Sequence, residues 1–167
     1  PRIGTVKLVQ CNFSQYSSRY DAFCAGDVQP AFDPACAGGA LMDLGVYNVS
    51  YIVGLFGEPN QAKYTANMER GIDTSGILTM DYSGFKAVSI AAKDCAAPAR
   101  YTIQGTKVYI LQKSTANCCG GITFHPNEGK EEHYNLNGGR PRQAAEFEAF
   151  ARALESGDQE LCGRMQD

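Results

Sequence analysis

The sequence predicts an α+β domain, with a largely antiparallel open sheet and helices packed on one face. Short strand-like runs separated by turn residues fill most of the chain, whereas helical periodicity occurs in two places, residues 40–56 and 141–155. The 167 residues are 44% hydrophobic and 20% charged, which is ordinary for one globular domain with a sizeable core. We therefore expect residues 1–167 to form a single domain with few helices.

The first third of the chain predicts a strand, a loop and a helix in that order. Residues 3–13 are rich in Val and Leu without a helical stripe, as in a strand buried on both faces. Residues 14–39 mix Ser, Asp, Pro and Gly, and predict a long loop with one short helical turn. A strongly apolar helix begins at Gly39 or Ala40 and ends at Phe56, just before a glycine. Its expected apolar stripe consists of Met42, Val46, Val49, Val53 and Phe56.

The remainder of the chain predicts further strands and one closing helix. Ser83-Gly84 predicts a tight hairpin turn, so neighbouring strands should run antiparallel. Apolar side chains at helical spacing predict a helix over residues 141–155. Because both helices would cover one face, the other face of the sheet should form a homo-oligomer by sheet-to-sheet contact. The expected strands are residues 62–69, 76–82, 85–92, 100–104, 107–111, 122–124 and 132–136.

Composition and charge argue against several classes of partner. The net charge is -3 and no basic run is interleaved with aromatics, so we expect no nucleic acid. Seven cysteines without a C-x-x-C pair predict reduced thiols and a cytoplasmic protein. The apolar run 40–56 is interrupted by Asp43 and Asn48, which favours a core helix and no membrane partner. The chain begins at Pro1 without an initiator Met or a signal peptide, as expected of an excised fragment.

Common cofactor and metal motifs are missing from the sequence. No two of the eighteen glycines have the G-x-G spacing of a dinucleotide-binding turn, so we expect no dinucleotide to bind this chain alone. The adjacent Cys118 and Cys119 lack the spacer of a zinc site, and we expect no metal. His125 and His133 are expected to be surface or structural residues, since no nucleophile and carboxylate accompany them in a recognisable motif.

The apolar helix opens with an acid and a phenol, Asp43 and Tyr47, four residues apart. That spacing places both side chains on one helix face, one above the other. A buried ionisable group in an apolar helix costs desolvation energy, so the pair is a candidate for proton handling. A structural interpretation stays open, in which Asp43 caps or salt-bridges the first turn and Tyr47 packs as an amphipathic aromatic side chain.

The run Gly38-Gly39-Ala40-Leu41-Met42-Asp43-Leu44-Gly45-Val46-Tyr47 resembles the substrate-site helix of the glucose-fructose oxidoreductase and inositol dehydrogenase (Gfo/Idh/MocA) family. In that helix a Gly-Gly-rich turn leads into Asp-x-Gly-x-His or Asp-x-Gly-x-Tyr. Other segments are similar to the family in the same order and together span nearly the whole chain. They are Ile3-Gly4-Thr5-Val6, Asp73, Asp81-Tyr82-Ser83-Gly84, Ile103-Gln104-Gly105-Thr106-Lys107 and residues 147–157.

The resemblance implies a C-terminal substrate-binding and oligomerisation domain, whose N-terminal Rossmann domain for NAD or NADP is absent from this chain. It also implies that the full-length protein transfers a hydride to or from a sugar, dihydrodiol or related polyol, and that the isolated fragment is inactive. Tyr47 takes the position of the family's His or Tyr, which exchanges or orients the proton of the substrate hydroxyl. Asp43 takes the position of the acid that orients that hydroxyl.

Two features of the family pattern limit what the resemblance implies. The family's catalytic lysine belongs to a Glu-Lys-Pro motif, which does not occur in this sequence and is expected in the absent N-terminal half. The tyrosine variant at Tyr47 is typical of members that act on aldoses and dihydrodiols, whereas histidine is typical of the inositol branch. Inositol is therefore the less favoured substrate on this resemblance.

Two other functions remain open on the sequence. The chain could be a non-catalytic oligomerisation module, or a small-ligand binding module of the same fold. A G-x-G-x-x-G strand-helix start and a Glu-Lys-Pro upstream of Pro1 would favour the enzyme. Tight binding of a sugar by the fragment without cofactor would favour the small-ligand module.

Overall fold

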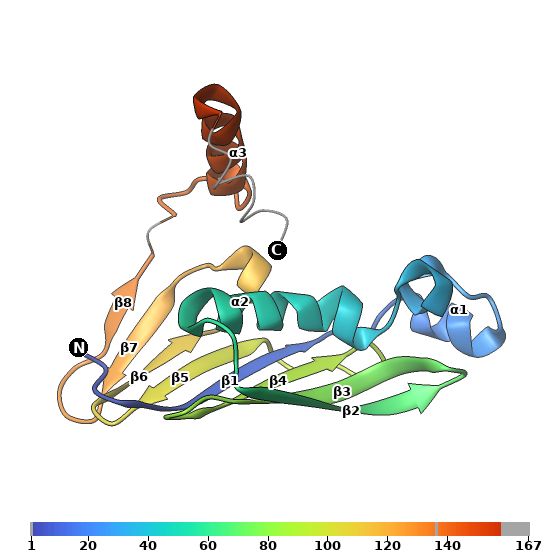
Figure 1. Cartoon of the computed structure of the whole chain (residues 1–167), viewed down its shortest axis with the longest axis horizontal. Coiled ribbons are helices and arrows are strands. Elements are labelled where there is room, and N and C mark those ends of the chain that lie inside the picture. Colours follow the sequence, from blue (N-terminus) through green and yellow to red (C-terminus); the bar gives the residue numbers. More distant parts are fainter. Residues whose placement is uncertain (1, 136, 158–167) are drawn as a thin grey trace. The chain divides into compact units, whose positions relative to one another are not determined.

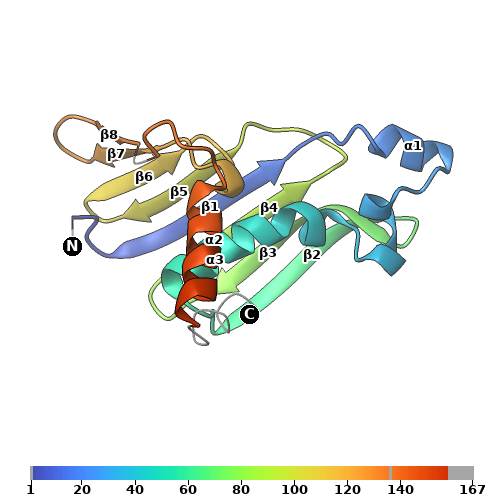
Figure 2. The same ribbon diagram turned by 90° about the horizontal axis from the view of Figure 1, so that it is seen from above.

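The computed structural model describes residues 2–135 and 137–157, which fall into two compact units that divide after Asn135. The first unit is an α+β fold in which an open, mostly antiparallel sheet of eight strands carries a long helix across one face (Figures 1 and 2). The predicted fold class is thus confirmed.

All the expected strands are present in the described residues, although Leu136, predicted to end the last strand, lies outside them. The strands lie in the order β2-β3-β4-β1-β5-β6-β7-β8. β1 lies between β4 and β5, parallel to β4 and antiparallel to β5. The strand bounds are β1 Val6–Ser14, β2 Gln61–Glu69, β3 Ile72–Asp81, β4 Lys86–Ala92, β5 Arg100–Gly105, β6 Val108–Gln112, β7 Ile122–Pro126 and β8 Glu132–Tyr134.

β1 is buried on one face only. Val9, Cys11 and Phe13 are buried beneath the helix, whereas Leu8 and Gln10, which point to the opposite face, are exposed. The prediction that both faces of this strand are buried is therefore wrong. Side chains alternate along a strand, and the helix of this unit covers one of the two faces.

The long loop between β1 and the helix has a small apolar core of its own. It contains one short helix, α1 (Tyr20–Ala25), and two single 3₁₀ turns, Pro30–Phe32 and Pro34–Cys36. Aromatic side chains of the loop pack on a residue of β3 in a buried cluster of Phe23, Phe32 and Ile72. The predicted loop with a short helical turn is confirmed, and the loop is packed against the sheet rather than free in solvent.

The predicted apolar helix is confirmed, but it opens in an unexpected conformation. Leu41–Gly45 forms a π-helical turn, and α2 (Val46–Phe56) follows it directly. Isolated π turns within helices occur frequently at functional sites. The stretch Pro34–Phe56 has the length and hydropathy of a membrane-spanning helix. In this structure, however, the fully buried Ile52 belongs to the core that the helix shares with the sheet, as in a core helix.

The buried side of this helix matches the predicted apolar stripe only in part, since Phe56 packs against the core. Met42 and Val46 of that stripe are 55% and 41% exposed, whereas Asn48 is fully buried. The Asn48 amide donates hydrogen bonds to Ser89 Oγ at 3.0 Å and to the Ile90 carbonyl at 2.9 Å. The amide also accepts a hydrogen bond from the Tyr101 hydroxyl at 2.5 Å. A buried polar side chain with all these partners is tolerated in a core, and this explains why Asn48 is buried.

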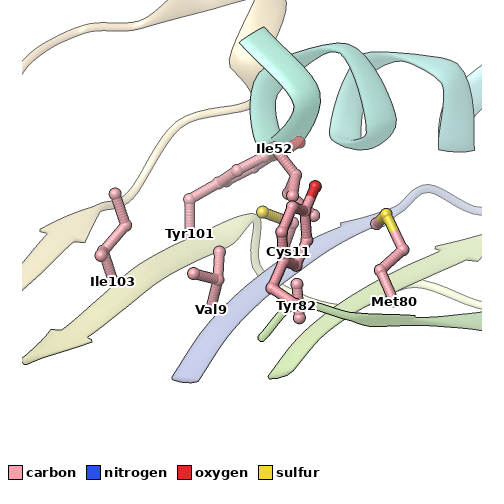
Figure 3. Close-up of a cluster of buried hydrophobic side chains, with 8 residues drawn as sticks. Val9, Cys11, Ile52, Met80, Tyr82, Tyr101 and Ile103 are labelled. Carbon is pink, nitrogen blue, oxygen red and sulfur yellow. The ribbon is translucent and has the colours of Figure 1, made fainter. Parts of the chain in front are cut away.

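The main core lies between α2 and the sheet, and Figure 3 shows its side chains converging beneath the helix. Contacts of α2 with β1 and β4 hold the helix on the centre of the sheet. Burial raises the pKa of the Cys11 thiol to about 12, so this cysteine behaves as a small apolar residue. The cluster consists of Val9, Cys11, Ile52, Met80, Tyr82, Ala87, Tyr101 and Ile103.

The second unit contains α3 (Ala144–Ser156), which ends at Gly157 and confirms the predicted closing helix. Three apolar side chains of this helix, Phe147, Phe150 and Leu154, are exposed. The packing of this helix on the sheet, and with it the single domain over residues 1–167, stay predictions.

Candidate functional site

Asp43 and Tyr47 lie near the ends of β1 and β4, the one parallel pair among the described strands: Tyr47 packs on Phe13 of β1, and Asp43 pairs with Lys93, which follows β4. Asp43 is in the π turn and Tyr47 is one helical turn further on, at the start of α2. The Asp43 side chain is 43% exposed and Tyr47 is 39% exposed. The acid is therefore not buried as its apolar surroundings in sequence suggested, and both groups are open to a ligand from solution.

A second acid, Asp73 of β3, holds the beginning of this helix. Its Oδ2 accepts hydrogen bonds from the Leu41 backbone N–H at 2.7 Å and from the Tyr64 hydroxyl at 2.6 Å. The first N–H groups of a helix have no partner within the helix, and a carboxylate there also interacts favourably with the helix dipole. Gly39 has a φ of 107°, and a Cβ at this position would lie 1.9 Å from Asp73 Oδ1. The Gly-Gly turn thus lets the acid approach the helix.

Lys93 is the residue that anchors Asp43. Lys93 follows β4, and its Nζ lies 2.7 Å from Asp43 Oδ2, although the lysine side chain is only 1% exposed. The same ammonium donates a hydrogen bond to the Ala31 carbonyl and lies 4.2 Å from the centre of the Phe32 ring. Lysine is almost never fully buried unless it is paired, and here a carboxylate, a carbonyl and an aromatic face surround it.

The neighbouring acid, Asp94, is occupied by other groups. Its Oδ2 accepts hydrogen bonds from the hydroxyls of Thr74 and Ser75, both at 2.8 Å. Burial acts to raise the pKa of this carboxyl, but these hydrogen bonds, together with one from Cys95, outweigh it and lower the pKa. Asp94 therefore fastens β3 to the end of β4, while Lys93 is left to Asp43.

Tyr47 packs by its ring and leaves its hydroxyl available. The ring lies 5.8 Å from that of Phe13, centre to centre, at an angle of 43°. Among the described residues, no group forms a hydrogen bond with the Tyr47 hydroxyl. Three hollows of about 330 to 360 Å³ are lined by other parts of the sheet and its loops, and none of them includes Asp43 or Tyr47. Both side chains are therefore open to solvent in this unit.

The structural interpretation of Asp43 and Tyr47, an ion pair and aromatic packing, is confirmed in part. Asp43 does form an ion pair, but with a lysine from the end of β4 rather than within its own turn. Tyr47 does pack as an aromatic side chain. What remains beyond packing is one carboxylate oxygen and one phenol hydroxyl, both exposed and neither engaged by a described residue.

The two histidines belong to the last two strands of the sheet, β7 and β8. His125 Nδ1 lies 2.8 Å from Glu131 Oε1, and its ring stacks on that of Tyr109 with 4.3 Å between the ring centres, as in a structural residue. His133 is mostly exposed and its Nδ1 lies 2.9 Å from Thr123 Oγ1. Within the described ranges, no three His, Cys, Asp or Glu side chains gather in a way that could hold a metal ion.

Sequence reasoning missed Lys93 and the part played by Asp73. A lysine directly after a strand usually lies at the surface, and nothing local to Lys93 indicates burial. Asp73 was noted only as a point of family resemblance, and its link to the helix joins residues 32 positions apart. Both contacts join segments far apart in the chain, so no local signal in the sequence could have found them.

Known proteins resemble this chain in sequence and in fold. Residues 1–111 match the family model of the GFO/IDH/MocA C-terminal domain. Over 150 residues the chain is 35% identical to scyllo-inositol 2-dehydrogenase (NADP(+)) IolU of Bacillus subtilis (strain 168), covering 89% of this chain and 45% of that protein. The chain thus spans about half the length of this relative.

Two solved structures share the fold. UDP-N-acetylglucosamine 3-dehydrogenase GnnA from Acidithiobacillus ferrooxidans has a TM-score of 0.68 at 16% identity, covering 93% of this chain and 46% of its own. An inositol dehydrogenase homolog from Azotobacter vinelandii, complexed with NADH and myo-inositol, has a TM-score of 0.65 at 9% identity, covering 83% and 37%. At such identities these structures show the fold alone. The family model and the 35% identical relative together show that this chain belongs to the Gfo/Idh/MocA family, within which it matches the C-terminal domain.

Proposed function

We propose that this chain is the substrate-binding C-terminal domain of an NAD(P)-dependent oxidoreductase, which transfers a hydride to or from a sugar, dihydrodiol or related polyol. The observation that carries the proposal is the exposed pair at the start of the helix. Lys93 holds one carboxylate oxygen of Asp43, and no described residue engages the other oxygen or the Tyr47 hydroxyl. Such a pair can receive a hydroxyl group that must be oriented and exchange a proton.

The two residues take different roles in this proposal. Tyr47 exchanges or orients the proton of the substrate hydroxyl, because its own hydroxyl is accessible and can both donate and accept. Asp43 accepts a hydrogen bond from the substrate and orients it. A phenol is a weak base at neutral pH unless a cation lies nearby. We assign that cation to a lysine of the N-terminal domain, since Lys93 is sealed behind Asp43.

The cofactor in this proposal is NAD or NADP, bound by an N-terminal Rossmann domain outside this chain. When bound, the nicotinamide supplies or accepts the hydride. The absence of G-x-G spacing in this sequence fits a chain that leaves dinucleotide binding to another domain. An exposed acid and phenol on an uncovered surface fit a site that is completed by that domain. The names of the relatives, which mention NADP(+) and NADH, support the same cofactor class.

Inositols belong among the candidate substrates. The tyrosine at position 47 argued for aldoses or dihydrodiols, but the 35% identical relative is a scyllo-inositol 2-dehydrogenase. The inositol dehydrogenase homolog of similar fold was solved with myo-inositol. An acceptor and a donor one helical turn apart suit any substrate with neighbouring hydroxyl groups, so the proposal keeps the whole polyol and sugar class.

Turnover by the full-length protein tests the proposal. We expect reduction of NAD⁺ or NADP⁺ with at least one of scyllo-inositol, myo-inositol, glucose and a cyclic dihydrodiol, and no reduction by the isolated chain. The variant carrying Tyr47→Phe and Asp43→Asn should lose nearly all of this activity. Wild-type turnover in that variant would refute the assigned site, and a full-length protein inactive on the whole panel would refute the proposed function.

We also propose a homo-oligomer that forms through the uncovered face of the sheet. Leu8, Ile77 and Tyr109 point away from α2 on three different strands, and are between 37% and 47% exposed. Exposed apolar side chains gathered on one sheet face commonly mark a protein interface. A monomeric mass in solution at micromolar concentration would count against this assembly.

We further propose a cytoplasmic protein. Cys11, Cys24, Cys36 and Cys95 are free thiols, as is usual in a reducing compartment. Cys162, the seventh cysteine, lies outside the described residues. Fractionation of cells that express the full-length protein should place it with the cytosol, and recovery from the culture medium would contradict this.

A further inference from the structure

The ion pair of Lys93 and Asp43 is sealed at one end and open at the other. The lysine side chain is 1% exposed, whereas the aspartate side chain is 43% exposed. The ammonium therefore cannot contact a substrate, yet the carboxylate that it holds can. This asymmetry distinguishes the pair from a core ion pair, in which both charges are buried, and from a surface pair, in which both are free to move.

All three directions around the Lys93 ammonium are taken. Asp43 Oδ2 occupies one, the Ala31 carbonyl a second and the face of the Phe32 ring a third. Ala31 and Phe32 belong to the loop with its own apolar core, and the Ala31 carbonyl also accepts a hydrogen bond from the Gly39 N–H at 3.1 Å. The ammonium is thus fixed to the same Gly-Gly turn that begins the helix.

Asp43 is held at both its backbone and its side chain. Its N–H donates to the Gly39 carbonyl at 3.1 Å, and Oδ2 faces Lys93. The other oxygen, Oδ1, has no partner among the described residues. An ammonium in a site shut off from water attracts a carboxylate far more strongly than it would in bulk solvent. The side chain is therefore kept in one orientation before any substrate arrives.

We infer that Lys93 is a positioning residue, whose buried ammonium fixes the Asp43 carboxylate so that its free oxygen accepts a hydrogen bond from the substrate hydroxyl. This inference rests on the proposed function. It assigns a fixed acceptor role to Asp43 and leaves proton exchange to Tyr47. It also explains why a lysine is buried at the end of β4, where an apolar residue would cost less to desolvate.

A double-mutant cycle in the full-length protein tests the inference. Lys93→Met, Asp43→Asn and the double variant are compared for kcat and KM with NADP⁺ and whichever panel substrate the wild type turns over best. Lys93→Met should lower kcat about 10- to 100-fold, since misplacing a catalytic group by about 1 Å has effects of this size. In the Asp43→Asn background the same substitution should lower kcat no further, because Lys93 acts through that carboxylate.

Equal losses of kcat in both backgrounds would show that Lys93 acts on the fold in general, and would overturn the inference. Lys86→Met is the matched control, because Lys86 forms a 2.9 Å ion pair with Asp81 in which both side chains are exposed. Its kcat should equal that of the wild type. Thermal melting of each variant identifies the temperature range in which all of them are folded, and kcat is compared there.

Phe32→Leu provides a second route if Lys93→Met does not fold. This substitution removes the aromatic face from the ammonium and keeps the ion pair. We expect a fall in kcat of about threefold, in line with the loss of one cation–π contact, and no fall in the Asp43→Asn background. A fall of the same size in both backgrounds would overturn the inference. Failure of the proposed function has a different signature, which is a wild-type protein inactive on every substrate of the panel.

Discussion

The helical segment from Leu41 to Phe56 presents two faces that treat polar side chains in opposite ways. On the face toward the sheet, Asn48 is fully buried and its amide bonds to Ser89, Ile90 and Tyr101. On the face that is open to solvent, Lys93 holds one oxygen of Asp43, and no described residue holds the Tyr47 hydroxyl. The inner polar group is used up by the fold, whereas the outer groups keep bonding capacity for a ligand. Unused capacity at a rigid position, rather than polarity itself, marks the candidate site.

Tyr47 and Tyr51 test the difference between the two faces most directly. Tyr47→Phe should lower kcat of the full-length protein by about 100- to 10,000-fold, the usual contribution of a general acid or base. The free energy of unfolding should change by less than about 0.5 kcal/mol, because the hydroxyl is exposed. Steady-state kinetics and urea denaturation measure the two quantities.

Tyr51→Phe removes the same atom one turn further along, from a ring that packs on Tyr101 at 5.3 Å. Burial raises the pKa of the Tyr51 hydroxyl to about 12, and this group should have no part in proton exchange. We expect kcat to be unchanged by the control. If both substitutions lower kcat alike, the contrast between the faces is wrong.

A substitution on the inner face should lower the free energy of unfolding rather than kcat. Asn48→Leu removes the acceptor of the buried Tyr101 O–H and two further hydrogen bonds, to Ser89 Oγ and the Ile90 carbonyl, and a buried group left without its partner costs about 1–3 kcal/mol. We expect the free energy of unfolding to fall by about 3 kcal/mol in urea denaturation, with kcat per folded molecule unchanged. Adding Tyr101→Phe should recover part of this loss, since it removes one of the unpaired groups; a further loss of the full size would contradict the account.

The junction of the two faces depends on the Gly-Gly turn. Gly39→Ala would combine a left-handed φ of 107° with a clash at Asp73, and should cost about 3 kcal/mol of unfolding free energy. Gly26→Ala is the matched control, because Gly26 has a φ of 99° and open space around it. The control should cost about 1–2 kcal/mol. Equal costs in thermal or urea denaturation would show that the contact with Asp73 is not what requires glycine.

Alkaline pH should affect the inner face and its core first. The pKa of the Cys11 thiol is 9.0 in the unfolded chain and about 12 in the folded protein, so the folded protein keeps the proton to a higher pH. The contribution of this thiol to the free energy of unfolding is therefore fully present below pH 9.0 and is lost as the pH rises toward 12. Over the first pH unit above 9.0 the loss is about 1 kcal/mol. Cys11→Ala should make this slope shallower over the first pH unit above 9.0 in urea denaturation, and a slope equal to that of the wild type would place its origin elsewhere.

Much of the fold follows from signals that lie close together in the chain. Ser83-Gly84 joins β3 to β4 in the expected hairpin, and the helix ends beside Gly57 as expected. The helical stripe could not be obtained in this way. Asn48 is buried because Ser89 and Tyr101, 41 and 53 positions away, meet its amide. Hydrophobic periodicity counts Asn48 as an outer residue, since periodicity contains no information about partners elsewhere in the sheet.

The sequence by itself determined the strands, the helix and the four-residue spacing of Asp43 and Tyr47, because turn residues and periodicity act within a few positions. The tertiary structure alone decided that both groups are exposed and that Lys93 is buried behind Asp43. That arrangement depends on β1 and β4 ending side by side and on a loop folding over the lysine. Burial and ion pairing are properties of surroundings that distant segments build together, so they emerge only when the chain is folded.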